Sequence, residues 1–313
     1  MSEKPLEKAM GVVREERRQG LALPSRAASL QNLRSTKDAP PDFSERGGTK
    51  RERIGIFDSG VGGLTVMAAI QRLLPNESLV YLGDTARVPY GNKSADTILR
   101  YTEECCTFLA AKNVKAIVVA CNTASAHAFP YLTHKFHFPV MGVIAPGVEC
   151  ALRTTRNRHI GVIGTEATIQ SDVYAKELKK RENDVTITSL ACPLFVPLVE
   201  EDWLDNEVTM AAAKKYLADL NQDGVDTLIL GCTHYPLLKR IIAKVVGEKV
   251  RLVDSAEAVA LALQELLQEK SLLSEQTEGA SSQLYVTDLS SRFENIARRF
   301  LNRAVPSVKR VTL

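Results

Sequence analysis

Two cysteines, Cys121 and Cys232, follow short apolar runs of similar sequence and lie 111 residues apart. The stretches read VVACNTAS (118–125) and LILGCTHYP (228–236), and a threonine follows each cysteine within two residues. Where a parallel strand turns into a helix, free backbone N–H groups and the helix dipole lower the pKa of a thiol. One such cysteine is more often a small apolar side chain of the core, but two in matching positions favour a shared chemical function.

Two thiols on opposite sides of one site could invert a carbon centre. One group removes a proton and the other delivers a proton to the opposite face, and matched groups suit a reaction that must run both ways. A thiolate also acts as a base without strong hydration, in a pocket that excludes water. Disulfide chemistry is the competing interpretation, but it normally uses cysteines that are close together in sequence.

The residues around the two cysteines suit a small zwitterionic amino acid as the ligand. Asp58 and Ser59, in FDSGVGG, end a predicted strand, where a carboxylate can meet a substrate ammonium or a thiol. Polar groups that directly follow the cysteines can donate hydrogen bonds to a substrate carboxylate. They belong to Asn122, Thr123, Thr233 and His234.

Four further residues belong to the candidate site. Tyr90 and Gly91 form a turn that can line it. Thr165 begins GTEAT, at a position that echoes the loop after the first strand. Glu200, in FVPLVEED, fits a surface carboxylate and a site carboxylate equally well.

Structural roles are open for several of these residues. Asp58, Asn122 and Thr165 could merely cap helices, and His234 could be a structural histidine. The GVGG stretch is a weak phosphate-loop signal because it lacks the Lys-Ser/Thr of a P-loop. The remaining cysteines, Cys105, Cys106, Cys150 and Cys192, are expected to pack in helices or in the core.

Short apolar runs alternate with longer helical patterns from Ile54 onward. The predicted strands are 54–57, 79–83, 116–120, 139–143, 159–164, 185–190, 227–231 and 251–254, and helical patterns include 63–74, 95–112, 207–222 and 235–247. Continuous apolar strands between amphipathic helices indicate parallel sheets covered on both faces. The predicted fold class is therefore α/β, doubly wound, with mostly parallel sheets.

The cysteine stretches belong to a longer internal echo. IGIFDSGVGG (54–63) matches IGVIGTEATI (160–169) in the order of strand, small and hydroxyl residues and helix start. We therefore expect two pseudo-symmetric α/β domains, one from residues 51–145 plus 257–313 and the other from 146–256. Ligands of such sheets bind beyond the carboxyl ends of the strands, so a site in the cleft between the domains is expected.

Composition excludes several other classes of protein. Lys and Arg exceed Asp and Glu by three over 313 residues, and the whole excess lies in residues 1–50. The rest of the chain has no net charge, so a nucleic-acid partner is not expected. Apolar runs are too short for a membrane span, and the N-terminus lacks the apolar region of a signal peptide. The six cysteines show no C-x-x-C pair and no metal-ligand spacing. Reduced thiols in the cytoplasm, without a metal, are the expectation.

Residues 1–50 differ from the rest of the chain. A possible helix over 5–19 leads into a stretch rich in Ser, Pro and Gly. A mobile tail is favoured over a docked regulatory element.

From about Ile54 to the C-terminus the sequence closely resembles glutamate racemase. The motifs that carry the resemblance are IGIFDSGVGGLTV, YLGDTARVPYGNKS, VVACNTAS, FVPLVEE and LGCTHYPLL, in that order. The resemblance implies two flavodoxin-like domains with the site between them. It also implies interconversion of L- and D-glutamate without pyridoxal phosphate, another cofactor or a metal, in support of peptidoglycan synthesis.

The resemblance also implies roles for individual residues. Cys121 and Cys232 would be the two acid/base groups. Asp58 would assist the first, and Glu200 and His234 would assist the second. The substrate-holding positions would be Asp58, Ser59, Tyr90, Gly91, Asn122, Thr123, Thr165, Thr233 and His234.

Several expectations concern partners and competing functions. Family members are commonly homodimers, and some with N-terminal extensions depend on the activator UDP-N-acetylmuramoyl-alanine, which makes residues 1–50 a candidate regulatory segment. A related reaction on aspartate or another small acidic compound is an alternative, as is a non-catalytic role as a topoisomerase inhibitor. The histidine in LGCTHYP, where an acidic residue would favour other substrates, favours glutamate.

Overall fold

The computed structural model describes residues 49–313 except for 219, 221–223, 277–278, 291–292 and 302–304. The predictions for residues 1–48, including the helix over 5–19, lie outside the described residues. Within the described part, no helix is both long and apolar enough to cross a membrane.

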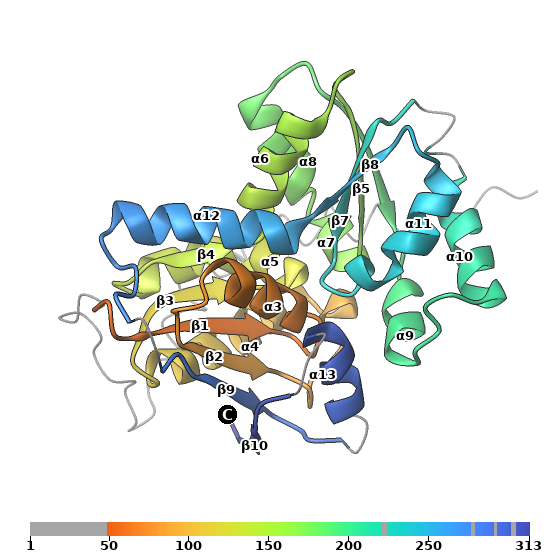
Figure 1. The fold of residues 1–313 in the computed structure, drawn as a ribbon. Coiled ribbons are helices and arrows are strands. Elements are labelled where there is room, and N and C mark those ends of the chain that lie inside the picture. The colour runs from red at the N-terminus through yellow and green to blue at the C-terminus, as the bar shows by residue number, and fades with distance from the viewer. Residues whose placement is uncertain (1–48, 219, 221–223, 277–278, 291–292, 302–304) are drawn as a thin grey trace, which may run out of the picture. The chain divides into compact units, whose positions relative to one another are not determined.

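The described strands form two parallel sheets (Figure 1). The first sheet has the order β10-β9-β2-β1-β3-β4, and the second has the order β6-β5-β7-β8. Every strand pair in both sheets is parallel. The strands of the first sheet are β1 (Arg53–Asp58), β2 (Leu79–Gly83), β3 (Val114–Val119), β4 (Val140–Gly142), β9 (Ser282–Val286) and β10 (Val308–Arg310), and those of the second are β5 (His159–Gly164), β6 (Thr186–Ala191), β7 (Thr227–Gly231) and β8 (Arg251–Asp254).

Helices follow most of the strands and cover the sheets. Those that follow strands of the first sheet are α3 (Leu64–Leu73), α4 (Ala95–Ala110), α5 (Asn122–Lys135), α6 (Ile144–Thr154) and α13 (Phe293–Leu301). Those that follow strands of the second are α7 (Glu166–Gln170), α8 (Val173–Arg181), α9 (Phe195–Glu200), α10 (Glu207–Leu217), α11 (Lys239–Val246) and α12 (Ser255–Glu269). Two short 3₁₀ turns, η1 (Tyr90–Asn92) and η2 (Tyr235–Leu238), complete the set.

The two sheets share a strand order. The order β2-β1-β3-β4 in the first sheet corresponds position by position to β6-β5-β7-β8 in the second. Cys121 lies just beyond β3, and Cys232 follows β7, which is the matching strand. The prediction of two similar α/β halves is therefore confirmed, whereas the exact domain boundaries stay a prediction.

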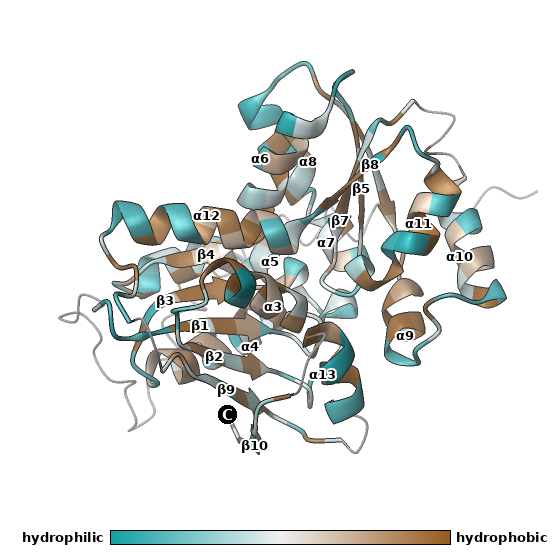
Figure 2. Ribbon diagram, viewed as in Figure 1, coloured by the Kyte–Doolittle hydropathy of each residue, from teal (hydrophilic) through white to brown (hydrophobic). Residues whose placement is uncertain are grey.

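Both faces of the first sheet are buried. Ile54 and Ile56 of β1 pack with α3 in one apolar cluster, while Phe57 and Ile117 pack with α4 and α5 in another. Figure 2 shows β1 as mostly apolar, and α12 and α13 as helices that carry both polar and apolar residues. This is the pattern of a sheet between two helical layers, and it is why apolar runs predicted β1, β2 and β3.

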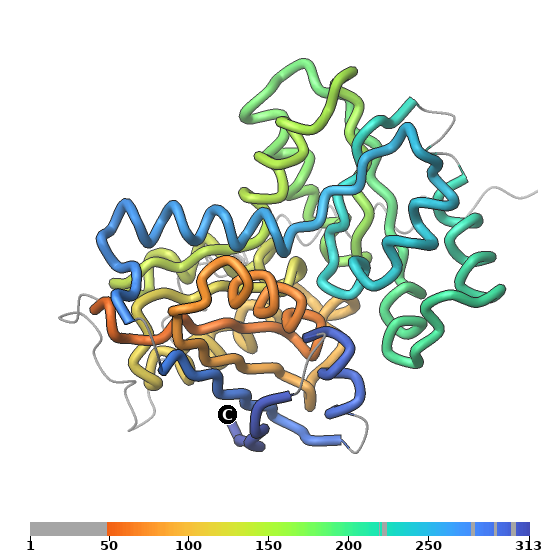
Figure 3. The backbone as a smooth tube through the Cα atoms, in the orientation of Figure 1, coloured from red at the N-terminus to blue at the C-terminus, as the bar shows by residue number. Residues whose placement is uncertain are grey.

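The last part of the chain returns to the first sheet. From β8 the chain enters α12, which packs against α3 and α6, and β9 then pairs with β2 (Figure 3). Sequence analysis did not identify β9 or β10. Their sequences, SQLYV and VKR, are short and partly polar. β10 is an edge strand with half-buried or exposed residues, whereas β9 lies between β10 and β2.

The strand β3 begins at Val114, before the predicted start at residue 116, because a buried lysine interrupts the apolar pattern of the sequence. Lys115 is fully buried, and its Nζ lies 2.6 Å from Oε2 of Glu77 and donates to the carbonyl oxygen of Leu272 at 2.7 Å. A buried ammonium is tolerated only when it is paired and hydrogen-bonded. Because lysine is polar, the apolar pattern did not indicate that residue 115 belongs to the strand.

Candidate active site

Cys121 lies where β3 turns into α5. It is the N-cap of α5, and its Sγ accepts a hydrogen bond from the backbone N–H of Ala124 at 3.5 Å. The hydroxyl of Ser59, which follows β1, lies 3.2 Å from the same Sγ. Only 5% of Cys121 is exposed, so two adjacent strand ends hold the thiol in a nearly dry environment.

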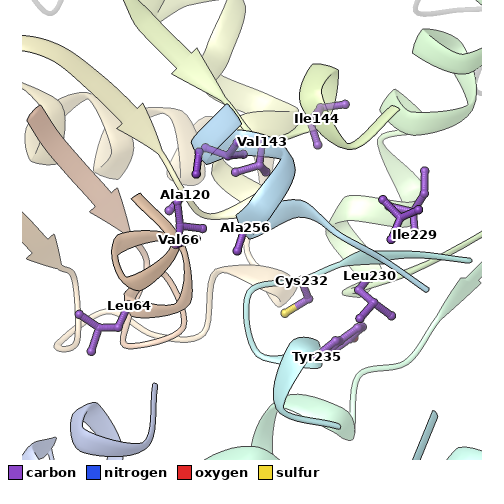
Figure 4. Close-up of a cluster of buried hydrophobic side chains, with 14 of the residues drawn as sticks. Leu64, Val66, Ala120, Val143, Ile144, Ile229, Leu230, Cys232, Tyr235 and Ala256 are labelled. Atoms are coloured by element: carbon purple, nitrogen blue, oxygen red, sulfur yellow. The ribbon is translucent and has the colours of Figure 1, made fainter. Parts of the chain in front are cut away.

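Cys232 occupies the matching position after β7. It contributes to the apolar cluster that Figure 4 shows around Leu230 and Tyr235, and 6% of it is exposed. Its Sγ lies 3.9 Å from Nδ1 of His234, and Nε2 of His234 lies 3.1 Å from Oε1 of Glu200, the last residue of α9. A carboxylate, an imidazole and a thiol therefore form a chain that ends at Cys232.

Asp58 connects the two cysteine loops. It is fully buried, its Oδ2 accepts from the N–H of Gly60 at 2.9 Å, and its Oδ1 accepts from Oγ1 of Thr233 at 3.4 Å. Burial raises the pKa of Asp58, and the positive charge of His234 opposes that rise. The Asp58 carboxylate thus accepts a hydrogen bond from the segment that carries Cys232, and its charge also acts on Cys121.

The pKa of Cys121 differs from the sequence-based expectation. A cysteine at a helix start was expected to have a lowered pKa, but burial and the neighbouring carboxylate of Asp58 raise the pKa of Cys121 to about 12. Hydrogen bonds from Ser59 and Ala124 lower it only in part. The expectation was wrong because desolvation and a like charge outweigh the helix dipole. Cys121 is therefore protonated at neutral pH.

His234 has the opposite electrostatic character. Burial by itself would lower the pKa of His234, but its hydrogen bonds to Cys232 and Glu200 raise it to about 10. The imidazole is therefore charged at neutral pH and lies between two groups that a positive charge stabilises as anions. A positive charge next to a thiol favours the thiolate.

A cluster of hydroxyl groups joins the two halves near Cys121. The Oγ1 atoms of Thr123, Thr165 and Thr168 lie 3.0 to 3.1 Å from one another. Thr165 also caps α7 by accepting from the N–H of Thr168 at 3.3 Å. Gly91 of η1 contacts this cluster closely, because a Cβ there would lie 2.8 Å from Cβ of Thr165.

Asn122 presents an amide nitrogen without a hydrogen-bond partner among the described residues. Its Oδ1 accepts from the hydroxyl of Tyr174 on α8 at 2.6 Å. Its Nδ2 is buried and has no hydrogen-bond partner in the described structure. Buried donors without a partner are rare, so this N–H₂ group marks the place where a ligand with an acceptor oxygen would bind.

Tyr90 is held in place by a second carboxylate. Its hydroxyl donates to Oδ2 of Asp84 at 2.6 Å, and Asp84 also accepts from Arg87 at 2.6 Å and from Thr287 of the segment after β9 at 2.8 Å. The hydroxyl of Tyr90 is thus already used. The ring of Tyr90 packs against Phe57 and Tyr101, so its role in lining the site stays a prediction, whereas Gly91 lies against Thr165.

The structure brings the predicted residues together around the two thiols, but it does not test their catalytic roles, which stay predictions. Glu200 and not its neighbour Glu201 contacts His234. Sequence reasoning missed Thr168, Tyr174 and Asp84. Thr168 stands three residues after Thr165, the spacing of an N-cap and its partner, and could have been found. Tyr174 had no signal, because its position on α8 is that of an ordinary core residue.

Known proteins are similar to this chain in sequence and in fold. Residues 54–263 match the family described as Asp/Glu/Hydantoin racemase. A glutamate racemase of Geobacter metallireducens is 50% identical over 260 residues, which cover 83% of this chain and 96% of the relative. The structure is similar to that of glutamate racemase from Francisella tularensis in complex with D-glutamate, with a TM-score of 0.79, 38% identity, and coverage of 84% of this chain and 98% of that one.

A second solved structure is the glutamate racemase of Escherichia coli in complex with L-glutamate and the activator UDP-MurNAc-ala. Its TM-score is 0.67 at 31% identity, and the match covers 80% of this chain and 94% of that one. The family match and the identity to curated relatives over most of the chain agree with the geometry of the two strand-end cysteines. The chain belongs to the Asp/Glu/Hydantoin racemase family.

Proposed function

We propose that the protein racemises glutamate by two proton transfers, with Cys121 and Cys232 as the acid and base. The observation that carries the proposal is the opposite electrostatic setting of two thiols at matching strand ends. Asp58 and burial keep Cys121 protonated, while Cys232 lies beside the charged imidazole of His234. One thiol is thus set to give a proton and the other to take one.

The protons balance in each direction. The Cys232 thiolate removes the α-proton from one face of the substrate, and the Cys121 thiol delivers a proton to the other face. The product leaves Cys232 protonated and Cys121 as the thiolate, which is the state that acts on the opposite enantiomer. Two groups of this kind fit a substrate and product that are mirror images and equal in free energy.

Groups around the thiols suit an acidic amino acid. The free Nδ2 of Asn122 can donate to a carboxylate. Thr123 follows Asn122 in the chain, and its hydroxyl lies 3.0 Å from that of Thr165. Asp58 can accept from an ammonium group. Racemisation of glutamate would supply D-glutamate for cell-wall synthesis.

Deuterium exchange tests the proposal directly. We expect purified protein in deuterated water to convert either enantiomer of glutamate to the racemate and to place solvent deuterium at the α-carbon. Cys121→Ser and Cys232→Ser should each lower turnover by about 10²- to 10⁴-fold, the range of general acid–base catalysis. Cys150→Ser, at a half-buried position on α6 outside the site, should retain turnover.

Two outcomes would refute parts of the proposal. Full activity of either site variant would remove that cysteine from the mechanism. Faster racemisation of aspartate than of glutamate would assign the site to another acidic substrate of the same family.

Two finer proposals concern binding partners. We propose activation by UDP-MurNAc-ala, because the similar Escherichia coli enzyme was solved with that activator. Rates of the full chain with and without the compound test it, and equal rates would contradict it. We also propose a homodimer, which light scattering of the purified protein would detect.

A further inference from the structure

We propose that Tyr174 is a positioning residue that fixes the Asn122 amide and connects the two cysteine loops. Tyr174 lies at the start of α8 in the second half, and only 3% of it is exposed. Its hydroxyl reaches Oδ1 of Asn122, the residue after Cys121. This inference rests on the proposed function, since it concerns how the same site holds its substrate.

The hydrogen bond decides which end of the amide faces the site. Burial raises the pKa of Tyr174, so the phenol remains a neutral donor at any working pH. A phenol that donates to Oδ1 at 2.6 Å leaves both hydrogens of Nδ2 free. The unpaired, buried Nδ2 is then a fixed donor to an acceptor oxygen, as a substrate carboxylate would provide. Rotation of the amide by half a turn would instead present an acceptor, which repels a carboxylate.

The ring of the same tyrosine lies against the other cysteine loop. A Cβ on Gly231, the residue before Cys232, would lie 3.2 Å from Cε2 of Tyr174. On its other edge the ring borders Gly147 of α6, where a Cβ would lie 3.6 Å from Cε1. One side chain thus spans from the residue before Cys232 to the residue after Cys121. Its ring and its hydroxyl together set the relative position of the two loops.

Removal of the hydroxyl alone tests the amide-orienting role. Tyr174→Phe keeps the ring against Gly231 and removes only the donor to Asn122. We expect KM for both enantiomers to rise about three- to tenfold, the range of one hydrogen bond's net contribution. We expect kcat to change less, because a contact made equally to bound substrate and transition state affects KM.

A double-mutant cycle separates this role from a general loss of packing. In the Asn122→Ala background, Tyr174→Phe should have no further effect on KM, because the amide that it orients is absent. Tyr285→Phe is the matched control. It removes the hydroxyl of another buried tyrosine, on β9 and outside the site, and should leave KM unchanged.

Each outcome decides the inference. An unchanged KM in Tyr174→Phe, or an equal rise of KM in the Asn122→Ala background, would overturn it while wild-type racemisation preserves the proposed function. A wild-type protein that neither racemises glutamate nor exchanges its α-proton would overturn the proposed function and this inference with it.

Discussion

At the residue scale, the two thiols differ more than their positions do. Both follow the third strand of a four-strand unit, yet Cys121 lies near a carboxylate and Cys232 near an imidazole. The difference arises in the first strand of each unit. Asp58 ends β1, whereas the matching last residue of β5 is Gly164. The two units thus share a strand order but differ in the charged residues near their cysteines.

Replacement of His234 should change the pH profile of racemisation. In His234→Asn the thiol of Cys232 loses its charged neighbour, and we expect kcat/KM at pH 7.5 to fall by about 10- to 100-fold. The variant should lack the decline near pH 10, because it has no imidazolium to lose its proton. The wild type should stay level until the imidazolium loses its proton near pH 10.

His159→Asn provides the control for this profile. That histidine begins β5 and contacts Oγ1 of Thr188 at 3.0 Å, away from both cysteines. Parallel pH profiles for wild type and His234→Asn would show that the charge of the imidazole does not govern the pH dependence of racemisation.

The residues of the site were predictable where they follow an apolar strand directly. Cys121, Cys232 and Asp58 stand at such strand ends, and their types suggest chemistry. Tyr174 was not predictable, since its role depends on which loop α8 faces. The pKa of Cys121 was predicted in the wrong direction, because the sequence does not show that Asp58 and complete burial act on one sulfur.

At the element scale, the turn after β1 brings backbone against the Cys232 loop. A Cβ on Gly62 would lie 2.2 Å from Oγ1 of Thr233 and 2.7 Å from Nδ1 of His234. The glycine is therefore required by close approach between the two halves. The same turn places Gly60, whose N–H binds Asp58.

Gly62→Ala should impair catalysis more than stability. The added methyl must displace Thr233 or His234, so we expect kcat/KM to fall by at least about tenfold, while overpacking lowers the free energy of unfolding by about 1–3 kcal/mol. The matched variant Gly147→Ala lies inside α6, where a Cβ meets only ordinary contacts. It serves as the control for stability and should unfold at the same or a slightly higher temperature. Wild-type kinetics in Gly62→Ala would contradict the close approach.

The elements that could be predicted were those with a strong apolar pattern. All eight predicted strands occur. β1, β2, β3, β5 and β7 are buried along nearly their whole length, and parallel strands of this kind read as apolar runs. The strands β9 and β10 were missed because their sequences, SQLYV and VKR, are short and partly polar and give no continuous apolar run. Lys115 obscured the start of β3, since only the folded structure supplies Glu77 as its partner.

At the scale of the whole described molecule, several buried groups hold protons that they would lose in the unfolded chain. Burial raises the pKa of Cys121 and of Cys192 to about 12 each. Hydrogen bonds hold the pKa of His234 at about 10. A raised pKa in the folded state means that stability falls as pH rises between the unfolded and the folded value. For the histidine this window runs from about 6.5 to 10, and for the thiols it begins near 8.5.

We therefore expect the free energy of unfolding to fall steadily from about pH 7 to pH 11, with the steepest loss above pH 9. Reversible urea unfolding at each pH, with reductant present, measures it. Cys192→Ala removes one of these thiols outside the catalytic set, and its stability should decline less steeply above pH 9, by up to about 1.4 kcal/mol per pH unit. Because alanine leaves a small cavity, the variant starts less stable at pH 7, and only the slope is diagnostic. Equal slopes for the two proteins would show that the buried Cys192 does not retain its proton in the folded state.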